Sequence, residues 1–260
     1  MSESFVTVTE ATGCNVSREQ VARMYTRYRF AAELCPQGAR ILETACGSGQ
    51  GLGYLARNAS SVSAIDIDDT LLQAARRHYA GNAKIRISKG DAHNLPFENE
   101  SLDAVILYEA IYYLPEPEKF AAEAFRVLAK GGKLIICSAN RELPDFNPSP
   151  FSRRYFSAGE LSGLMSVAGF SGISLYGNCL VDSSAKGKIL SLVKKTAVSM
   201  GLMPKTMRGK EWIKRVVFGG LVPLPAELKD GMAQYDKPQP LSGPGPHTRH
   251  KVIFAVGQKP

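Results

Sequence analysis

Hydrophobic positions follow a helical period at the start of the chain. Between residues 17 and 34 apolar side chains recur every three or four positions, which is the spacing of one face of an α-helix. Ser17 followed by Gln20 has the pattern of a capping box, and Pro36 marks where the helix must stop. The sequence therefore predicts an amphipathic helix over residues 17–34.

From residue 39 onward, short apolar runs alternate with further helical stretches. The predicted strands are 39–44, 61–67, 84–89, 102–108, 133–138, 173–176 and 251–256, and the predicted helices are 51–58, 69–79, 117–129 and 158–168. Alternation of this kind requires crossover connections, so it predicts an α/β fold with a mostly parallel, doubly wound sheet covered on both faces.

Length and cysteine usage limit the class of protein. The 260 residues are enough for one domain with a large core, or one domain with an insertion. Five widely spaced cysteines favour neither a disulfide framework nor a zinc site, and we expect no metal. The N-terminus has no signal-peptide pattern and no run reaches about 20 apolar residues, so we expect a cytoplasmic protein.

Charge is distributed unevenly along the chain, whose net charge is +8. Residues 1–140 hold 15 Lys+Arg and 16 Asp+Glu, whereas residues 141–260 hold 17 and 8. The basic excess belongs to the C-terminal part, where it favours a phosphorylated or otherwise anionic partner.

A glycine turn follows the first strand of the predicted sheet. Glu43 stands at the end of that strand, and Gly47 and Gly49 allow the backbone to approach a ligand closely. The dinucleotide fingerprint is absent, because Leu52 occupies the position of its third glycine. The turn alone is a weak indication of nucleotide binding.

Two further carboxylates occur where a nucleotide site needs them. Asp66 ends the second strand, 17 residues beyond Gly49, and a carboxylate there accepts ribose hydroxyls in doubly wound sheets. Asp91 follows the third strand and is placed to accept from an adenine amine.

In this order the motifs resemble the class I S-adenosylmethionine (SAM)-dependent methyltransferases. The resemblance spans residues 38–176 and is nearest to the ubiquinone/menaquinone-biosynthesis-like (methyltransferase type 11) branch. The motifs that carry it are Glu43-x-x-x-Gly47-x-Gly49, Asp66, Gly90-Asp91-Ala92 with Leu95-Pro96-Phe97, Leu102-Asp103-Ala104-Val105, and Arg126-Val127-Leu128 with Lys130-Gly131-Gly132. It implies a Rossmann-like sheet with an antiparallel last strand, SAM as cofactor, and methyl transfer.

The same resemblance implies a role for individual residues. Glu43, Ala45, Gly47 and Gly49 would flank the methionine part, Asp66 the ribose, and Ile67, Asp91 and Ala92 the adenine, with Tyr108 also at the cofactor. Tyr28 and Arg29 of the leading helix would cover the site, with Arg29 paired to the methionine carboxylate. The family usually has glycine at position 45, so we expect the turn to keep Ala45 at negative φ, slightly displaced.

The loop after the fourth strand holds the candidates for chemistry. Displacement at a sulfonium needs alignment and dehydration of the acceptor, and a base only where the acceptor loses a proton. Glu109 is predicted to orient or deprotonate the acceptor, and Tyr112 to contact it. We expect methyl transfer to nitrogen or oxygen of a small molecule.

Between the last two strands lies a long basic insertion. The predicted division is a core of residues 1–178 and 250–260, with a cap helix in 1–37, and a lid of residues 179–249. Helical patterning occurs at 186–200 and 210–218, and residues 182–220 hold nine Lys+Arg. The lid would suit a nucleotide-linked, phosphorylated or lipid-like acceptor, or contact with an anionic membrane, or it presents only a solvated face.

Three other classes compete with this interpretation. A nucleic-acid methyltransferase or binding protein would use the basic C-terminal region, but neither an Asn/Asp-Pro-Pro-aromatic motif nor a Pro-Cys nucleophile is present, so no nucleic acid is expected. A dehydrogenase is disfavoured by the spacing of the turn. An inactive scaffold with the same fold would bind no SAM.

Overall fold

The computed structural model describes residues 11–149, 151–181, 220–243 and 245–260. Its helices are α1 (Arg18–Leu34), α2 (Leu52–Ala56), α3 (Asp69–Tyr79), α4 (Pro117–Val127) and α5 (Ala158–Val167), with a 3-10 turn η2 at Ile111–Tyr113. Its strands are β1 (Asn15–Val16), β2 (Arg40–Thr44), β3 (Ser61–Asp66), β4 (Ile85–Lys89), β5 (Leu102–Tyr108), β6 (Leu128–Ala139), β7 (Ser171–Leu180), β8 (Val222–Pro223), β9 (Gln239–Pro240) and β10 (His250–Gln258).

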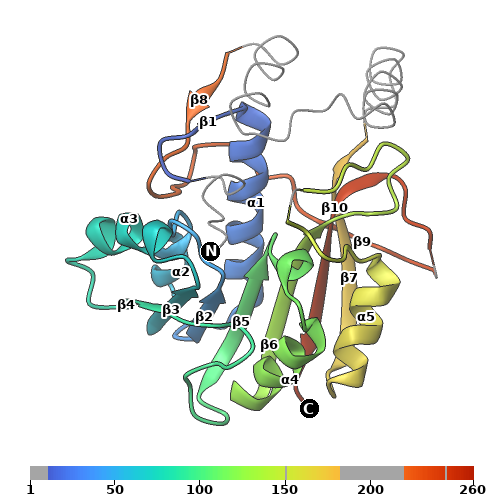
Figure 1. Cartoon of the computed structure of the whole chain (residues 1–260), viewed down its shortest axis with the longest axis horizontal. Helices are drawn as coiled ribbons and strands as arrows, with labels where there is room; N and C mark the ends of the chain where they lie inside the picture. The colour runs from blue at the N-terminus through green and yellow to red at the C-terminus, as the bar shows by residue number, and fades with distance from the viewer. Residues whose placement is uncertain (1–10, 150, 182–219, 244) are drawn as a thin grey trace.

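A twisted eight-stranded sheet organises most of these elements (Figure 1). Within the described residues its order is β4-β3-β2-β5-β6-β10-β7-β9, and β1 and β8 form a separate two-stranded antiparallel sheet. The pairs from β4 to β6 along this order are all parallel, and β10 runs antiparallel to both β6 and β7. This confirms the predicted Rossmann-like α/β fold with an antiparallel last strand.

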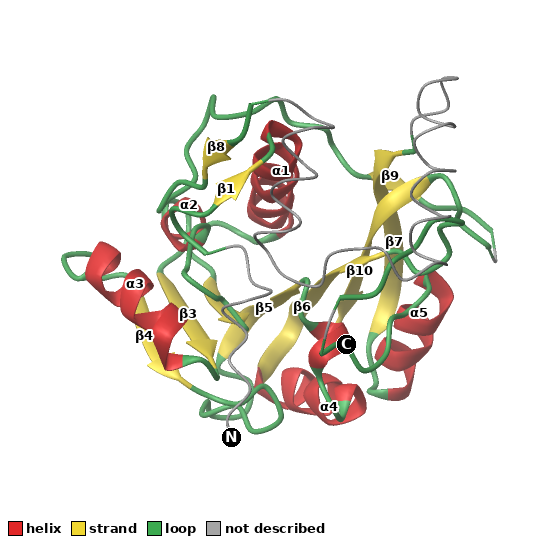
Figure 2. Ribbon diagram, turned by 45° about the horizontal axis from the view of Figure 1, so that its top comes forward, coloured by secondary structure: helices red, strands yellow, loops and turns green. Residues whose placement is uncertain are grey.

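Helices cover both faces of the sheet (Figure 2). Side chains of α1 and α2 form one buried cluster with one face, and side chains of α4 and α5 form a second cluster with the other. The predicted capping box at the start of α1 is present: Ser17 accepts from the Gln20 N–H, and the Gln20 side chain accepts from the Ser17 N–H. That cap fixes the register of α1 over the sheet.

Two strands are longer than predicted because of their pairing partners. β6 begins at Leu128 rather than 133, since Leu128 pairs with Leu102 of the parallel strand β5, and β7 extends to Leu180, which pairs with His250 of β10. The stretch predicted as a lid, 179–249, includes the short edge strand β9, which pairs with β7. These partners lie far away in the sequence, so local patterning did not reveal them.

Part of the predicted lid belongs to the body of the molecule. Leu224 and Leu228 are buried in the cluster under α1 and α2, and the Leu228 N–H donates to the carbonyl of Gln50 in the glycine turn at 2.8 Å. None of the described residues 220–243 lines the cavity at the carboxyl ends of the parallel strands. The two predicted helices and residues 182–219 lie outside the described residues, so a lid there stays a prediction.

No helix in the described ranges combines the length and the apolar composition needed to cross a bilayer.

Candidate functional site

A cavity of about 570 Å³ opens at the carboxyl ends of the parallel strands. Its walls come from the turn after β2, the ends of β3 and β4, the loop after β5, and one face of α1, with the start of β10 at the far side. Carboxyl ends of adjacent parallel strands converge at one edge of a sheet, which is where doubly wound folds bind ligands.

The glycine turn has a left-handed backbone at three positions. The φ angles are +54° at Ala45, +57° at Gly47 and +75° at Gly49. The expectation of negative φ at Ala45 was therefore wrong. The turn keeps the left-handed conformation that glycine favours, so the backbone of Ala45 is strained. A left-handed alanine costs about 1–2 kcal/mol, which the surrounding hydrogen bonds must offset.

Gly47 and Gly49 of the turn have different surroundings. Gly47 lines the cavity, and its N–H donates to Oδ2 of Asp66 at 2.8 Å. Gly49 does not line the cavity, contrary to its predicted place at the cofactor; a Cβ there would meet the side chains of Ala75 and Leu52 at 2.9 Å. Gly49 therefore allows the turn to pack on α3.

Asp66 is buried at the end of β3 and fixed by two backbone donors. Oδ2 accepts from Gly47, and Oδ1 accepts from the Asp68 N–H at 2.8 Å. Burial raises the pKa of Asp66 above its ordinary value, while these hydrogen bonds lower it and only partly compensate. Each oxygen retains a lone pair, so a diol can still bind.

Glu43 at the end of β2 is a buried carboxyl with one partner. The Tyr28 hydroxyl of α1 donates to Oε1 at 2.5 Å, whereas Oε2 is buried with no hydrogen-bond partner. Burial is the main reason that the pKa of Glu43 is raised to about 8; the hydrogen bond from Tyr28 opposes it, and the charge of Asp66 adds to it. An unpaired buried oxygen in a cavity wall is a place for a ligand donor.

Asp91 and His93 form a hydrogen-bonded pair beyond β4. Oδ1 of Asp91 accepts from the His93 backbone N–H at 2.9 Å and contacts its Nδ1 at 2.6 Å. Burial works against the charged carboxylate, but these hydrogen bonds outweigh it and lower the pKa of Asp91. Ile67 and Ala92 line the same region, and Ile67 is 57% exposed. A large apolar side chain exposed inside a cavity offers a surface for a flat, apolar ligand.

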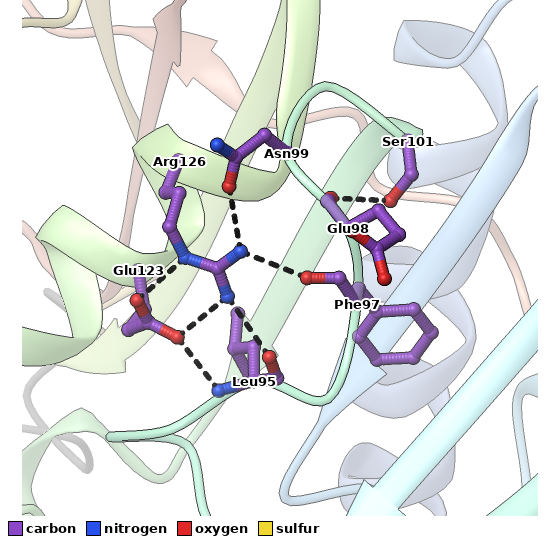
Figure 3. Close-up of polar contacts among 7 residues, drawn as sticks. All are labelled: Leu95, Phe97, Glu98, Asn99, Ser101, Glu123 and Arg126. Atoms are coloured by element: carbon purple, nitrogen blue, oxygen red, sulfur yellow. Dashed lines mark hydrogen bonds and ion pairs between the residues drawn. The ribbon is translucent and has the colours of Figure 1, made fainter.

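Arg126 of α4 secures the loop that follows this region (Figure 3). Its guanidinium donates to the carbonyls of Leu95 and Phe97 and to both oxygens of Glu123, and Glu123 in turn accepts from the Leu95 N–H. Two motifs about 30 residues apart, Leu95-Pro96-Phe97 and Arg126-Val127-Leu128, therefore belong to one structural unit. That unit anchors the backbone at Leu95, two residues beyond His93 of the cavity lining.

Glu109 stands at the opposite end of the cavity in a strained conformation. Its φ is +52°, which is uncommon for a residue with a side chain. Oε1 pairs with Arg27 of α1 at 2.9 Å, and Oε2 accepts from the Tyr112 hydroxyl at 2.9 Å. Tyr112 stacks on Tyr155 with a ring separation of 4.2 Å. Arg27 and Tyr112 both line the cavity, so their contacts fix the Glu109 carboxylate in its wall.

Most of the predicted site residues meet in this cavity. The lining includes Glu43, Ala45, Gly47, Asp66, Ile67, Asp91, Ala92, Tyr108, Tyr28, Glu109 and Tyr112. Gly49 and Arg29 are absent from it. Arg29 donates to the Tyr25 hydroxyl at 3.0 Å and lies over the ring of Tyr235, so its guanidinium is engaged outside the cavity.

Sequence reasoning missed the face of α1 that lines the cavity. That face carries Arg23, Met24 and Arg27 as well as Tyr28, at the i, i+4 spacing of one helical stripe. The spacing was visible, but which stripe meets the sheet depends on packing with residues far along the chain. Arg153 also lines the cavity, as does Lys251, which no local pattern marked as a site residue.

Comparison with known proteins agrees with this arrangement. Residues 42–136 match a family model described as a methyltransferase domain. A demethylmenaquinone methyltransferase of Clavibacter sepedonicus is 35% identical over 140 residues, 54% of this chain and 54% of that protein. A phthiotriol/phenolphthiotriol dimycocerosates methyltransferase of Mycobacterium leprae is 38% identical over 109 residues, 41% of this chain and 40% of that protein. The chain thus spans about half the length, or less, of these curated relatives.

Solved structures show the same fold over almost the whole chain. The crystal structure of a SAM-dependent methyltransferase from Thermotoga maritima covers 93% of this chain and 92% of its own, with a TM-score of 0.59 and 21% identity. Residues 42–136 therefore match a methyltransferase domain, the fold is that of the SAM-dependent methyltransferases, and together they indicate SAM as the cofactor.

Proposed function

We propose that this chain, which carries a class I methyltransferase domain, transfers the methyl group of SAM to a nitrogen or oxygen of a small-molecule acceptor. One observation carries the proposal: a single cavity joins the Glu43, Asp66 and Asp91 wall to the Glu109 and Tyr112 wall. A donor held at the first wall and an acceptor held at the second would meet in the space between them.

The residues of the first wall fit the parts of the cofactor. Asp66 would accept the ribose hydroxyls, and Ile67, Asp91 and Ala92 would hold the adenine. The turn at Gly47 and the unpaired Oε2 of Glu43 would hold the methionine end, with Oε2 accepting from the ammonium group. Bound SAM would supply the electrophilic methyl group.

Arg27 replaces Arg29 as the partner of the methionine carboxylate. It lines the cavity and precedes Tyr28, whose hydroxyl contacts Glu43. The Tyr108 hydroxyl donates to the Arg27 carbonyl at 2.9 Å and ties α1 to β5 at this point. A guanidinium here can contact the carboxylate of the cofactor while it keeps its ion pair with Glu109.

Transfer requires alignment more than acid–base chemistry. The acceptor lone pair forms a bond to the methyl carbon as the carbon–sulfur bond breaks, and the electron pair stays on sulfur to give S-adenosylhomocysteine. Glu109, held by Arg27 and Tyr112, is placed to accept a hydrogen bond from the acceptor and then its proton. Tyr112 and Tyr113 exclude water from that side of the cavity.

The cavity lining, rather than the relatives, supports the chemical class of the acceptor. The acceptors in the two relatives' names, demethylmenaquinone and phthiotriol/phenolphthiotriol dimycocerosates, differ from each other. The loop after β5 here offers a carboxylate and aromatic rings, which suit a polarised N–H or O–H on a small body.

Two measurements test the proposal. Calorimetry should show that the wild type binds SAM but not a nicotinamide dinucleotide, and that Asp66→Ala weakens SAM binding at least tenfold while the exposed control Glu98→Gln does not. Tritium from methyl-labelled SAM should then enter a small molecule of a metabolite extract. Lack of SAM binding by the wild type, or binding of the dinucleotide in its place, would overturn the proposal.

A further inference from the structure

Positive side chains gather at the acceptor end of the cavity. The lining there includes Arg23 of α1, Arg153 of the loop before α5 and Lys251 of β10, with Arg27 of α1 at the boundary to the cofactor wall. Among the described lining residues of this end, the one acidic side chain is that of Glu109, since the other three acidic residues lie at the cofactor wall: Glu43, Asp66 and Asp91. The acceptor end therefore has an excess of positive charge.

Two of these cations already have acidic partners. Arg27 pairs with Glu109 at 2.9 Å, and Lys251 pairs with Glu19 at 3.1 Å. Arg23 and Arg153 have no ion pair among the described residues. Moreover, Nε of Arg23 is buried and has no hydrogen-bond partner.

Arg23 occupies the middle of a stripe along α1. Glu19, Arg23 and Arg27 follow one another at i, i+4, so each lies about 6 Å from the next along the helix. Because Glu19 contacts Lys251 and Arg27 contacts Glu109, Arg23 lies between the start of β10 and the loop after β5. Along α1, Arg23 is also one helical turn further than Arg27 from Tyr28, whose hydroxyl contacts Glu43 at the cofactor wall.

The surroundings of Glu19 show that this region stabilises negative charge. Burial raises the pKa of Glu19, yet Arg23 and Lys251 together outweigh burial and bring the pKa below its ordinary value. Glu19 is exposed and pairs with Lys251, and it leaves the buried Nε of Arg23 unsatisfied. A buried guanidinium N–H without an acceptor is costly, and a bound anion would remove that cost.

We propose that the acceptor carries an anionic group, a carboxylate or a phosphate, which Arg23 binds through its guanidinium while Lys251 and Arg153 add charge at the same end. The inference rests on the proposed function for the identity of the acceptor, but not for the existence of the anion site. Tyr113 and Phe151, which also line this end, would hold the body of the acceptor between Arg23 and Glu109. The anionic group then lies about one helical turn from the reacting atom.

Three probes of similar size separate charge from shape: phenyl phosphate, benzoate and the neutral benzyl alcohol. Each is titrated calorimetrically into the full chain, with and without saturating S-adenosylhomocysteine. The variants are Arg23→Gln, Arg23→Lys, and the matched control Arg18→Gln, which removes the same charge from an exposed position at the start of α1.

We expect phenyl phosphate or benzoate to bind the wild type at least tenfold more tightly than benzyl alcohol. Arg23→Gln should lose that preference, Arg23→Lys should keep part of it, and Arg18→Gln should match the wild type. The stronger of the two anionic probes identifies the group as phosphate or carboxylate.

Other results would overturn the inference. Equal affinity for all three probes would do so, as would identical behaviour of Arg23→Gln and Arg18→Gln. If Arg23→Gln weakens S-adenosylhomocysteine by the same factor as the probes, Arg23 serves the cofactor carboxylate and the inference is wrong. Wild type that binds no S-adenosylhomocysteine contradicts the proposed function instead, and the titrations without it still decide the anion site.

Discussion

The Tyr28 hydroxyl donates to one oxygen of Glu43 at 2.5 Å and leaves the other oxygen buried and unpaired. Tyr28 comes from the helix that covers the sheet, and Glu43 from the strand end beneath it. The contact therefore closes the cavity and prepares a ligand-binding oxygen at the same time. Binding of an ammonium group there would replace a neutral buried carboxyl by an ion pair, because the pKa of Glu43 is raised to about 8.

Glu43→Gln tests this ionisation through the stability of the ligand-free protein. The folded-state pKa of about 8 exceeds the ordinary value, so the folded chain binds the extra proton and is favoured at low pH. As pH rises from about 4.5 to 8, the wild type should lose stability relative to Glu43→Gln by up to ~1.4 kcal/mol per pH unit. Urea unfolding at several pH values measures the difference.

The same substitution should alter proton release when SAM binds. Near pH 7 the wild type should release a proton as Glu43 ionises against the ammonium group, whereas Glu43→Gln should not. Calorimetry in buffers with different ionisation enthalpies counts the protons. Parallel stability profiles together with equal proton counts for both proteins would show that Glu43 is charged without ligand.

Tyr28→Phe removes only the hydroxyl from this pair. Loss of the donor leaves both buried oxygens of Glu43 without a partner, so we expect about 1–3 kcal/mol of destabilisation in urea unfolding. Tyr235→Phe is the matched control, since the Tyr235 hydroxyl donates to Glu33 at 3.0 Å in an exposed setting. There the loss should stay below ~0.5 kcal/mol; equal losses would mean that burial of the Glu43 contact contributes nothing.

Much of the fold could be predicted from local patterning. The strand that ends at Asp66 is a short apolar run, and α1 begins with a capping box, so both are determined within a few residues. The extension of β7 to Leu180 depends on pairing with β10, where Leu180 pairs with His250 far along the chain. No local pattern in β7 records that partner.

The candidate site divides in the same way. Glu43, Asp66 and Asp91 follow strands, and topology alone brings strand ends together, so the sequence predicted their meeting. The orientation of α1 was not predictable, because it depends on distant contacts such as the Tyr25 hydroxyl with Asp230 at 3.0 Å. Tyr25 and its partner Arg29 are absent from the cavity lining, whereas Arg23 of the same helix is part of it.

Gly51→Ala should disturb the cover of the cavity. A Cβ at Gly51 would lie 1.9 Å from the ring of Tyr28, so the ring must move. We expect a loss of about 2 kcal/mol in urea unfolding and weaker SAM binding. Gly81→Ala is the control, because no atom lies within 4 Å of its Cβ position. Similar behaviour of the two variants would show that the helix can shift without cost.

Glu109→Gln tests the acceptor side once labelled transfer into an acceptor is seen. The single-turnover rate should fall at least tenfold, because the amide cannot take the proton of the acceptor, while binding of S-adenosylhomocysteine stays within twofold of wild type. Glu98→Gln, an exposed position, serves as the control. An unchanged rate would exclude Glu109 as proton acceptor.

Ala45→Gly should stabilise the protein, because the turn already holds a conformation that glycine adopts without penalty. At φ +54° the alanine Cβ crowds the following carbonyl, and its removal should gain more than the extra chain entropy of glycine costs, for a net of ~1 kcal/mol in urea unfolding. Ala80→Gly, at φ −53° after α3, should instead lose roughly 0.5–1 kcal/mol. The opposite signs distinguish relief of strain from a general effect of glycine, and a loss of stability at both positions would mean that the left-handed turn at Ala45 carries no strain.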